Sequence, residues 1–534
     1  MPIRELYALS HEFPMASKGI NLWKSLPELE PNESPYMKNC IYRNGIAKRN
    51  GSAVHIATEV VTGKRIVGLH RFYYGASSSK LVAVSDTIQK YWDGAAWQNI
   101  RTGLTSDKPT NISPWLQSIY FANSTDTGNK WDGTTSTTLT GGGYTNPPQA
   151  PIQFLGYADR LLVIENTNSG ASVFGALRWS DSYSDTTWST AAACNVKPDS
   201  YLYGMCIHSS TNVSNGYSSK VLLAGANGMY LFSGTNLATS GGNYTIEKLG
   251  LPVGCNAPKT MVWTPKGTMW LGIDRQVYLL PFDTSTPIPI GRKITSNYDF
   301  LTQGVEDMPS TLTSGCCATY HRGYYILSVP SQYGTYNNTQ WWLDVNHLYS
   351  DGEYGPWFGP MTGQSINCFA TQDGTGDTGE LLGGEANSAT GSYIYECNKR
   401  GVHSDNGTAI DVVYRTFYNP LNDISVLKNV AFIESEILDT SSDVNVSLND
   451  IEGSLTQPTR FNLSTNSYYW SSMYWGEQYW NNTKPIRVQA EINPLIQCRR
   501  LAIQLEHNSS SDKFELYGLR VNALEQEKVY DERA

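Results

Sequence analysis

The sequence predicts an all-β protein with an extended N-terminal arm, a β-propeller of six or seven blades and a C-terminal β-sandwich. Aromatic residues make up 12% of the 534 residues, charged residues only 16%, and there are 47 glycines. This composition is typical of β-proteins that are rich in turns. Two patterns then divide the chain: a loose repeat through its middle, and longer alternating strands near its end.

The arm is predicted at residues 1–58, which show no helical periodicity. Turn residues stand at short intervals within it: Gly19, Asn21, Pro31 or Pro35, Asn39, and Arg49 with Gly51. We expect Arg49 to anchor the arm by charge-assisted hydrogen bonds, either across the blades or at an interface with a neighbouring subunit. The alternative is that these are ordinary turn residues and that Arg49 only caps a strand. An arm with few apolar contacts of its own is expected to serve assembly more than blade stability.

The propeller is predicted at residues 59–402 from a repeated hairpin pattern. In its clearest copy, the apolar run Leu81–Val84 is followed by a Ser-Asp turn, a second run at Ile88–Trp92 and a stop at Asp93-Gly94. Similar first runs begin near residues 81, 119, 161, 221, 268, 324 and 381. A period of about 40–50 residues with roughly four short strands indicates propeller blades. The longer intervals are expected to hold loop insertions.

The β-sandwich is predicted at residues 403–534, where the strands become longer. Six alternating strands are expected at residues 410–418, 429–438, 443–448, 486–492, 501–507 and 513–521. Residues 408–534 also carry six of the chain's nine net negative charges.

An aromatic segment interrupts this region at residues 467–480. It contains four tyrosines and three tryptophans: Tyr468, Tyr469, Trp470, Tyr474, Trp475, Tyr479 and Trp480. So many aromatic rings predict something other than a solvated loop. Three interpretations remain open: a strand pair folded onto the sandwich, a protein–protein interface, or a platform on which sugars stack.

The spacing of the arm residues resembles the opening of the propeller proteins found in the tails of short-tailed bacteriophages. That group includes the tail nozzle proteins (tail tubular protein B) and the packaged-DNA stabilisation or tail hub proteins. Two later stretches are similar to the same family. One is Arg178-Trp179-Ser180-Asp181 with Trp188, which resembles a blade element; the other is the 408–438 region, which resembles the segment that leaves the propeller.

The resemblance implies a structural virion protein, located in the tail and assembled in the host cytoplasm. It would form a nozzle or hub ring below the head-to-tail adaptor, a homohexamer because the adaptor ring is twelvefold. The ring would extend the DNA channel, help to retain packaged DNA and dock a tail fibre, spike or needle protein. A propeller's own channel is too narrow for duplex DNA, so the duplex is expected to pass through the ring's lumen. Because the chain is acidic, with a pI near 5.5, we expect no specific DNA binding.

Catalytic and cofactor motifs are not found in the sequence. The eight histidines form no HxxxH pair, and there is neither a GxxxxGK phosphate loop nor a GxSxG elbow. We therefore expect no enzyme activity, no cofactor and no metal. The nine cysteines are scattered without a CxxC and are expected to be buried, reduced thiols. No apolar run approaches 18 residues, so no membrane segment is expected. The alternative function is a glycan-binding or glycan-cleaving β-propeller that uses the aromatic segment.

Overall fold

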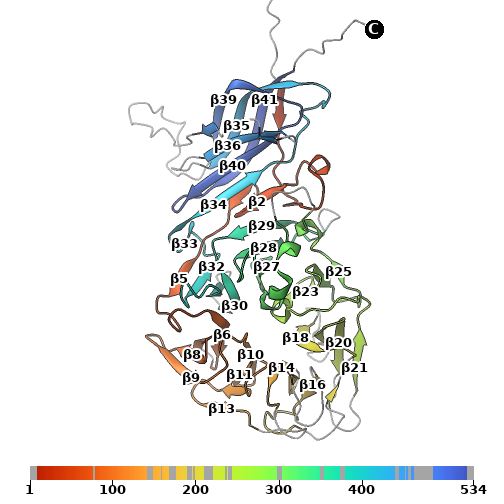
Figure 1. The fold of residues 1–534 in the computed structure, drawn as a ribbon, viewed down its shortest axis with the longest axis vertical. Helices are drawn as coiled ribbons and strands as arrows, with labels where there is room; N and C mark the ends of the chain where they lie inside the picture. Colours follow the sequence, from red (N-terminus) through yellow and green to blue (C-terminus); the bar gives the residue numbers. More distant parts are fainter. Residues whose placement is uncertain are drawn as a thin grey trace, which may run out of the picture.

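The computed structural model describes most of the chain between residues 9 and 525. It leaves out 76–77, 141–147, 158, 167–175, 189–194, 197–198, 210–219, 235–236, 238–242, 297–302, 349–353, 373–378, 439–443, 451–452, 455–458 and 462–484. The regular secondary structure of the described residues is almost entirely β-strand. A ring of small sheets lies at one end of the molecule and two larger sheets lie at the other, with β2 (Tyr36–Lys38) and β34 (Thr408–Arg415) between them (Figure 1).

The ring is a β-propeller, and its strands as described form seven blades of four antiparallel strands. Blade one is β6 (Ile66–Tyr73), β7 (Ser79–Ser85), β8 (Ile88–Trp92) and β9 (Trp97–Arg101). Blade two is β10 (Asn111–Trp115), β11 (Ser118–Ala122), β12 (Asn129–Trp131) and β13 (Ser136–Thr138). Blade three is β14 (Pro151–Tyr157), β15 (Arg160–Glu165), β16 (Ala176–Trp179) and β17 (Asn195–Val196). Blade four is β18 (Leu202–His208), β19 (Lys220–Gly225), β20 (Met229–Gly234) and β21 (Tyr244–Lys248).

The remaining blades carry the connections to the rest of the chain. Blade five is β22 (Val262–Thr264), β23 (Gly267–Leu271), β24 (Val277–Leu280) and β25 (Ile288–Pro289). Blade six is β26 (Cys317–His321), β27 (Tyr324–Val329), β28 (Thr339–Asp344) and β29 (Trp357–Thr362). Blade seven is β30 (Ile366–Gln372), β31 (Glu380–Glu385), β32 (Ile394–Cys397) and β5 (Ala53–Ile56). Short 3-10 turns are η1 (Leu26–Glu28), η3 (Pro258–Thr260), η4 (Arg292–Ile294), η5 (Val305–Asp307) and η6 (Ser310–Gly315).

The predicted repeat coincides with the second strand of each blade. All seven predicted run starts fall within two residues of the start of β7, β11, β15, β19, β23, β27 or β31. These strands are apolar on both faces because neighbouring blades cover both sides, so that Leu81 to Val84 are at most 1% exposed. The prediction of an all-β propeller of six or seven blades is confirmed, with seven blades.

The ring is closed by the N-terminal segment. Strand β5 is the outer strand of blade seven, and it pairs antiparallel with β32 through Ile56↔Ile394 and Ala53↔Glu396. The predicted arm includes residues 53–56, whereas the structure places them in the propeller. Because β5 precedes blade one in the chain and pairs within blade seven, it holds the first and last blades together.

The C-terminal sandwich has two sheets, and each contains strands from the arm. One sheet has the order β3 (Cys40–Tyr42), β4 (Ile46–Lys48), β41 (Glu515–Glu525), β35 (Lys428–Leu438) and β39 (Pro485–Cys498), with β1 (Leu9–Glu12) also paired to β41. The other has β2, β34, β40 (Ala502–Ser509), β36 (Val444–Asp450) and β37 (Gly453–Ser454), flanked by β33 (Ser404–Asp405) and β38 (Thr459–Phe461). The six long strands lie where the sequence predicted them. The sandwich is completed by four short arm strands, β1–β4, which have no counterpart among the predicted strands.

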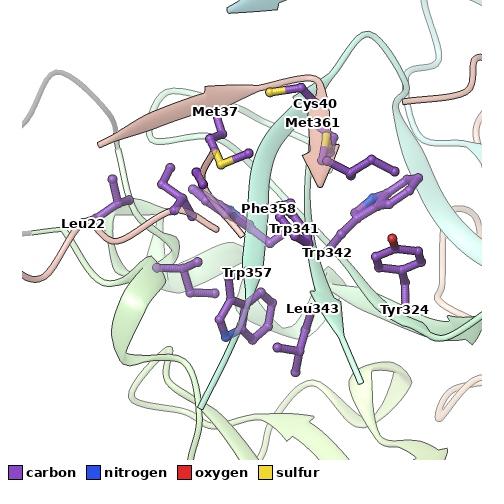
Figure 2. Packing of buried hydrophobic residues seen from close by; sticks show 14 of the residues in the cluster. Leu22, Met37, Cys40, Tyr324, Trp341, Trp342, Leu343, Trp357, Phe358 and Met361 are labelled. Carbon is purple, nitrogen blue, oxygen red and sulfur yellow. The ribbon is translucent and has the colours of Figure 1, made fainter. Parts of the chain in front are cut away.

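The arm also joins the sandwich to the propeller. Strand β2 pairs with β34 through Met37↔Tyr414 and with β29 of blade six through Met37↔Gly359. Blade six and one sandwich sheet are thereby continuous in a single eleven-stranded sheet. Figure 2 shows Leu22 and Met37 of the arm among the aromatic side chains of β28 and β29.

The arm is deeply buried, which contradicts the expectation that it makes few apolar contacts. Its apolar side chains with no exposed surface are Ala16, Ile20, Leu22, Met37, Cys40, Ile41 and Ile46. Burying one large aliphatic side chain contributes roughly 1.5–3 kcal/mol. We conclude that the arm is part of the common core of the propeller and the sandwich.

Substituting Gly19 tests how closely the arm lies on blade six. Gly19 has φ +73°, and a Cβ atom there would lie 2.1 Å from the carbonyl oxygen of Trp357, which is a backbone atom and cannot rotate away. We expect Gly19→Ala to lower the free energy of unfolding by several kcal/mol, because the arm must move off β29.

The matched control is Gly63→Ala, since Gly63 has φ +68° and nothing within 4 Å of such a Cβ. It should cost only about 1–2 kcal/mol, the strain of a left-handed alanine. Urea unfolding of both variants measures the difference. Equal losses would show that the arm does not press on Trp357.

Candidate functional site

The arm, blade six and the start of the sandwich meet at Arg49. Its side chain is 2% exposed and forms a bidentate ion pair with Asp405, in which Nη1 lies 3.0 Å from Oδ1 and Nη2 donates to Oδ2. The Nε atom donates to Oδ1 of Asn39 at 3.1 Å, and Nη2 also donates to the carbonyl oxygen of Thr362 in β29 at 2.5 Å. One guanidinium group therefore joins three parts of the chain, a role that the planar donor set of arginine suits.

Both oxygens of the Asp405 carboxylate accept hydrogen bonds at this junction. In addition to Arg49, it accepts hydrogen bonds from the Ser52 hydroxyl at 3.2 Å and from Nε2 of Gln364 at 2.8 Å. The backbones of the arm and of the segment around Ser404 also lie in direct contact. A Cβ atom on Gly51 would be 1.9 Å from the carbonyl oxygen of Ser404. Only glycine allows the arm to approach the segment that enters the sandwich.

A second buried charge fixes the arm to the connection between blades five and six. Glu33 is 1% exposed, and its Oε1 atom lies 3.5 Å from Nζ of the buried Lys293 in η4. The same oxygen accepts a hydrogen bond from Nδ2 of Asn21 at 2.8 Å, and Oε2 lies 3.2 Å from Nζ of Lys24. The carboxylate is thus compensated by two cations and an amide, as a buried charge requires.

A basic cleft of about 390 Å³ opens beside the Arg49 anchor. Its charged and titratable lining residues are Arg43, Lys48, Arg400, His403, Lys513 and Glu515. Lys48 donates to the carbonyl oxygens of Ser509 at 2.6 Å and Asp512 at 3.1 Å, and burial lowers its pKa to about 8. Burial, followed by the charges of Lys48 and Lys513, also lowers the pKa of His403. The cleft therefore presents positive charge on an acidic protein and attracts anionic groups.

The centre of the propeller is the other concave region. A cavity of about 470 Å³ is lined by residues from β10, β14 and β18 and by Lys259 in η3 of blade five. Nζ of Lys259 donates to the carbonyl oxygen of Val67 in blade one at 2.8 Å, and Gln153 and Asn111 bond to the neighbouring blades. No Asp or Glu is among the described residues that line this cavity. Since blades one and five are not adjacent, Lys259 closes the centre of the ring.

The sequence-predicted site residues have different outcomes. Arg49 is buried and makes its charge-assisted hydrogen bonds within the chain, to Asp405 and to Thr362 of blade six. Tyr468, Tyr469, Trp470, Tyr474, Trp475, Tyr479 and Trp480 lie outside the described residues.

Sequence reasoning missed Asp405, Glu33, Lys293 and Lys259. Each is an ordinary charged residue in the sequence, and each acquires its role from a partner that is distant along the chain. The resemblance motif was the one signal that pointed to this junction, because it contains Asn39, Arg49 and Gly51.

The eight described cysteines are free thiols and all but Cys206 are buried. Burial raises the pKa of Cys368 to about 11 and of Cys206 to about 12, so that both are protonated at neutral pH. Such thiols pack as small apolar side chains and are poor nucleophiles. In the part of the chain that the structure describes, no helix has the length and apolar character needed to cross a membrane.

Comparison with known proteins gives no family and only distant structural similarities. No family model and no curated protein matches the chain. Among solved structures, BBS1N in complex with ARL6DN aligns with a TM-score of 0.40 and 10% identity over 66% of this chain and 98% of that one. YCF48 bound to D1 peptide gives a TM-score of 0.36 and 9% identity over 65% and 97%. The WD40 β-propeller domain of Doa1 gives 0.36 and 10% over 65% and 97%.

A double-mutant cycle tests the Arg49 anchor. We expect Arg49→Met and Asp405→Asn each to lower the free energy of unfolding by about 3–5 kcal/mol, because each leaves a buried partner uncompensated. The double variant should cost clearly less than the sum of the two.

The control is Arg65→Met, which removes the exposed Arg65–Asp107 pair at 3.3 Å and should cost less than about 1 kcal/mol. Denaturant unfolding measures all four variants. A loss in Arg49→Met no larger than that in Arg65→Met would contradict the assignment of Arg49 as an anchor.

Proposed function

We propose that this chain is a structural subunit of a short-tailed phage tail, forming a nozzle or hub ring below the head-to-tail adaptor. The observation that carries the proposal concerns the arm residues by which the sequence resembles that family. Gly19 lies against Trp357 of blade six, and Gly51 lies against Ser404 in the segment entering the sandwich. Asn39 and Arg49 between them bond to both parts, to Thr362 in β29 and to Asp411 or Asp405. The motif thus corresponds to a specific way of joining a propeller to a sandwich.

The architecture suits a subunit of a ring that surrounds a channel. One sheet runs from blade six through β2 into the sandwich, and two buried ion pairs fix the arm to Asp405 and to Lys293. These contacts restrain the propeller and the sandwich relative to each other. In the proposed ring, the basic cleft of one chain faces the acidic C-terminal part of its neighbour.

The path of DNA in this proposal runs between chains. The cavity at the propeller centre has a volume of about 470 Å³ and is crossed by Lys259. It is too small for a DNA duplex, of which the major groove alone is about 12 Å wide. The lumen of the ring is therefore the conduit, and the chain's net charge of −9 opposes tight DNA binding there. The further partners are the adaptor on one side and a fibre, spike or needle protein on the other.

The alternative is a glycan-binding or glycan-cleaving propeller. A glycosidase needs two carboxyl groups about 5–9.5 Å apart on either side of the sugar. The described lining of the central cavity provides amides, two serine hydroxyls, a lysine and apolar side chains. The nozzle or hub is therefore the function that we favour.

Assembly is the direct test. We expect the purified chain to form a closed ring, with six copies as the preferred number, in native mass spectrometry and negative-stain images. If the aromatic segment lies at the contact between subunits, replacing Tyr474 and Trp475 with serine should shift the population towards monomers, because aromatic anchors dominate interface energies.

Tyr333→Ser is the control, since Tyr333 is 86% exposed on a described loop and is not part of the segment. It should leave the ring intact. A chain that stays monomeric at all concentrations, and whose aromatic segment binds oligosaccharide, would replace the proposal with its alternative.

A further inference from the structure

Three side chains converge where the arm closes the propeller ring. His55 lies in β5, Glu380 at the start of β31 and Glu396 in β32, and all three are half-buried. One imidazole nitrogen and one oxygen of each carboxylate lie within 4.8 Å of one another. These residues are 16 to 341 positions apart in the sequence, so no local spacing indicates the cluster.

The pairing of the strands explains the convergence. Glu396 is opposite Leu382 in β31, and Glu380 is two residues before Leu382, so both carboxylates share the face that packs towards blade one. The register shifts between the pairs Ile394↔Ile56 and Tyr395↔Val54, which makes His55 the extra residue of a β-bulge. A bulge reorients a side chain, and bulges are common beside functional sites.

The cluster has unmet bonding capacity. The Oε2 atom of Glu380 is buried and has no hydrogen-bond partner within the described structure. Leaving a carboxylate oxygen buried without a donor is costly. Glu396 is held by Lys399 at 2.5 Å, and the lysine is 40% exposed and can move into solvent. Arg71 of blade one and Lys399 are the cations that act on His55.

We propose that His55, Glu380 and Glu396 bind a divalent metal ion of the zinc class. One imidazole and two carboxylates form a donor set that zinc accepts, and three protein ligands leave one position for water. The ligands come from the arm strand and from the two blade strands beside it. The ion therefore fastens the N-terminal segment to blade seven, and its binding stabilises the closed ring.

Zinc titration of the full chain without a histidine tag tests the site. We expect one Zn²⁺ per chain by isothermal calorimetry and by elemental analysis after dialysis, together with a rise in Tm on addition of Zn²⁺. His55→Ala and Glu380→Gln should each weaken Zn²⁺ binding by more than about tenfold. Loss of a residue that only hydrogen-bonds to a metal ligand already costs about that much, and these two residues are the ligands themselves. Both variants should also remove the Zn²⁺-dependent rise in Tm.

Lys399→Met provides a readout that a purely structural cluster would not give. Because Lys399 competes with the metal for Glu396, this variant should bind Zn²⁺ more tightly than the parent chain. Glu306→Gln is the control, since Glu306 and Asp307 form an acidic pair around Ser296 without a histidine, and it should leave binding unchanged. Co²⁺ in place of Zn²⁺ should give a visible absorption band that is absent from His55→Ala.

The proposal is overturned if the parent chain binds no Zn²⁺. It is equally overturned if Zn²⁺ binds to the parent chain, His55→Ala and Glu380→Gln with the same affinity, which would indicate adventitious sites elsewhere. Circular dichroism of each variant in the absence of metal verifies that it is folded.

Discussion

The insertion of the N-terminal arm is the constraint on which the rest of this structure depends. Residues 9–56 supply strands to both sandwich sheets and to the last propeller blade, and the buried Arg49–Asp405 pair fixes the point where these parts meet. A buried ion pair is weak evidence for net stability, because desolvation offsets much of its attraction. The free energy comes mainly from the apolar side chains of the arm. The ion pair and the close approaches at Gly19 and Gly51 determine where the arm lies.

This arrangement affects the order in which parts of the chain can fold. Strand β1 pairs with β41, about 510 residues away, and β5 pairs with β32 about 340 residues away. The propeller hairpins are local and can form early, whereas β1 and β4 of the arm can pair only after β41 has been made. During synthesis, the apolar side chains of these arm strands therefore stay exposed until the sandwich strands have been made. Ring closure by β5 and completion of the sandwich by β1–β4 are consequently coupled, since one short segment performs both.

The sequence was informative where structure is local. Each second strand of a blade was predicted within two residues of its start because an apolar run, a turn and a second run lie next to one another. The short arm strands were not predicted, since three residues such as Tyr36–Lys38 carry no alternation and their partners are hundreds of residues away. Arg49 could be singled out, while Asp405 could not, because Ser404-Asp405-Asn406-Gly407 reads as an ordinary turn. The cluster of His55 with Glu380 and Glu396 has no sequence signal, as its members meet only through strand pairing.

Native-state hydrogen exchange followed by mass spectrometry at rising denaturant tests most directly whether the arm, the propeller and the sandwich are one cooperative body. The relevant peptides are those of β2 and β5, compared with β27 in the propeller and β40 in the sandwich. The account predicts that the amides of β2 and β5 exchange only with the same high-energy opening as β27 and β40, since β2 lies between β29 and β34 in one sheet and the pairing of β5 with β32 closes the ring. Exchange of β2 and β5 at much lower free energy, while β27 and β40 stay protected, would show that the arm is a peripheral strap and would contradict the account.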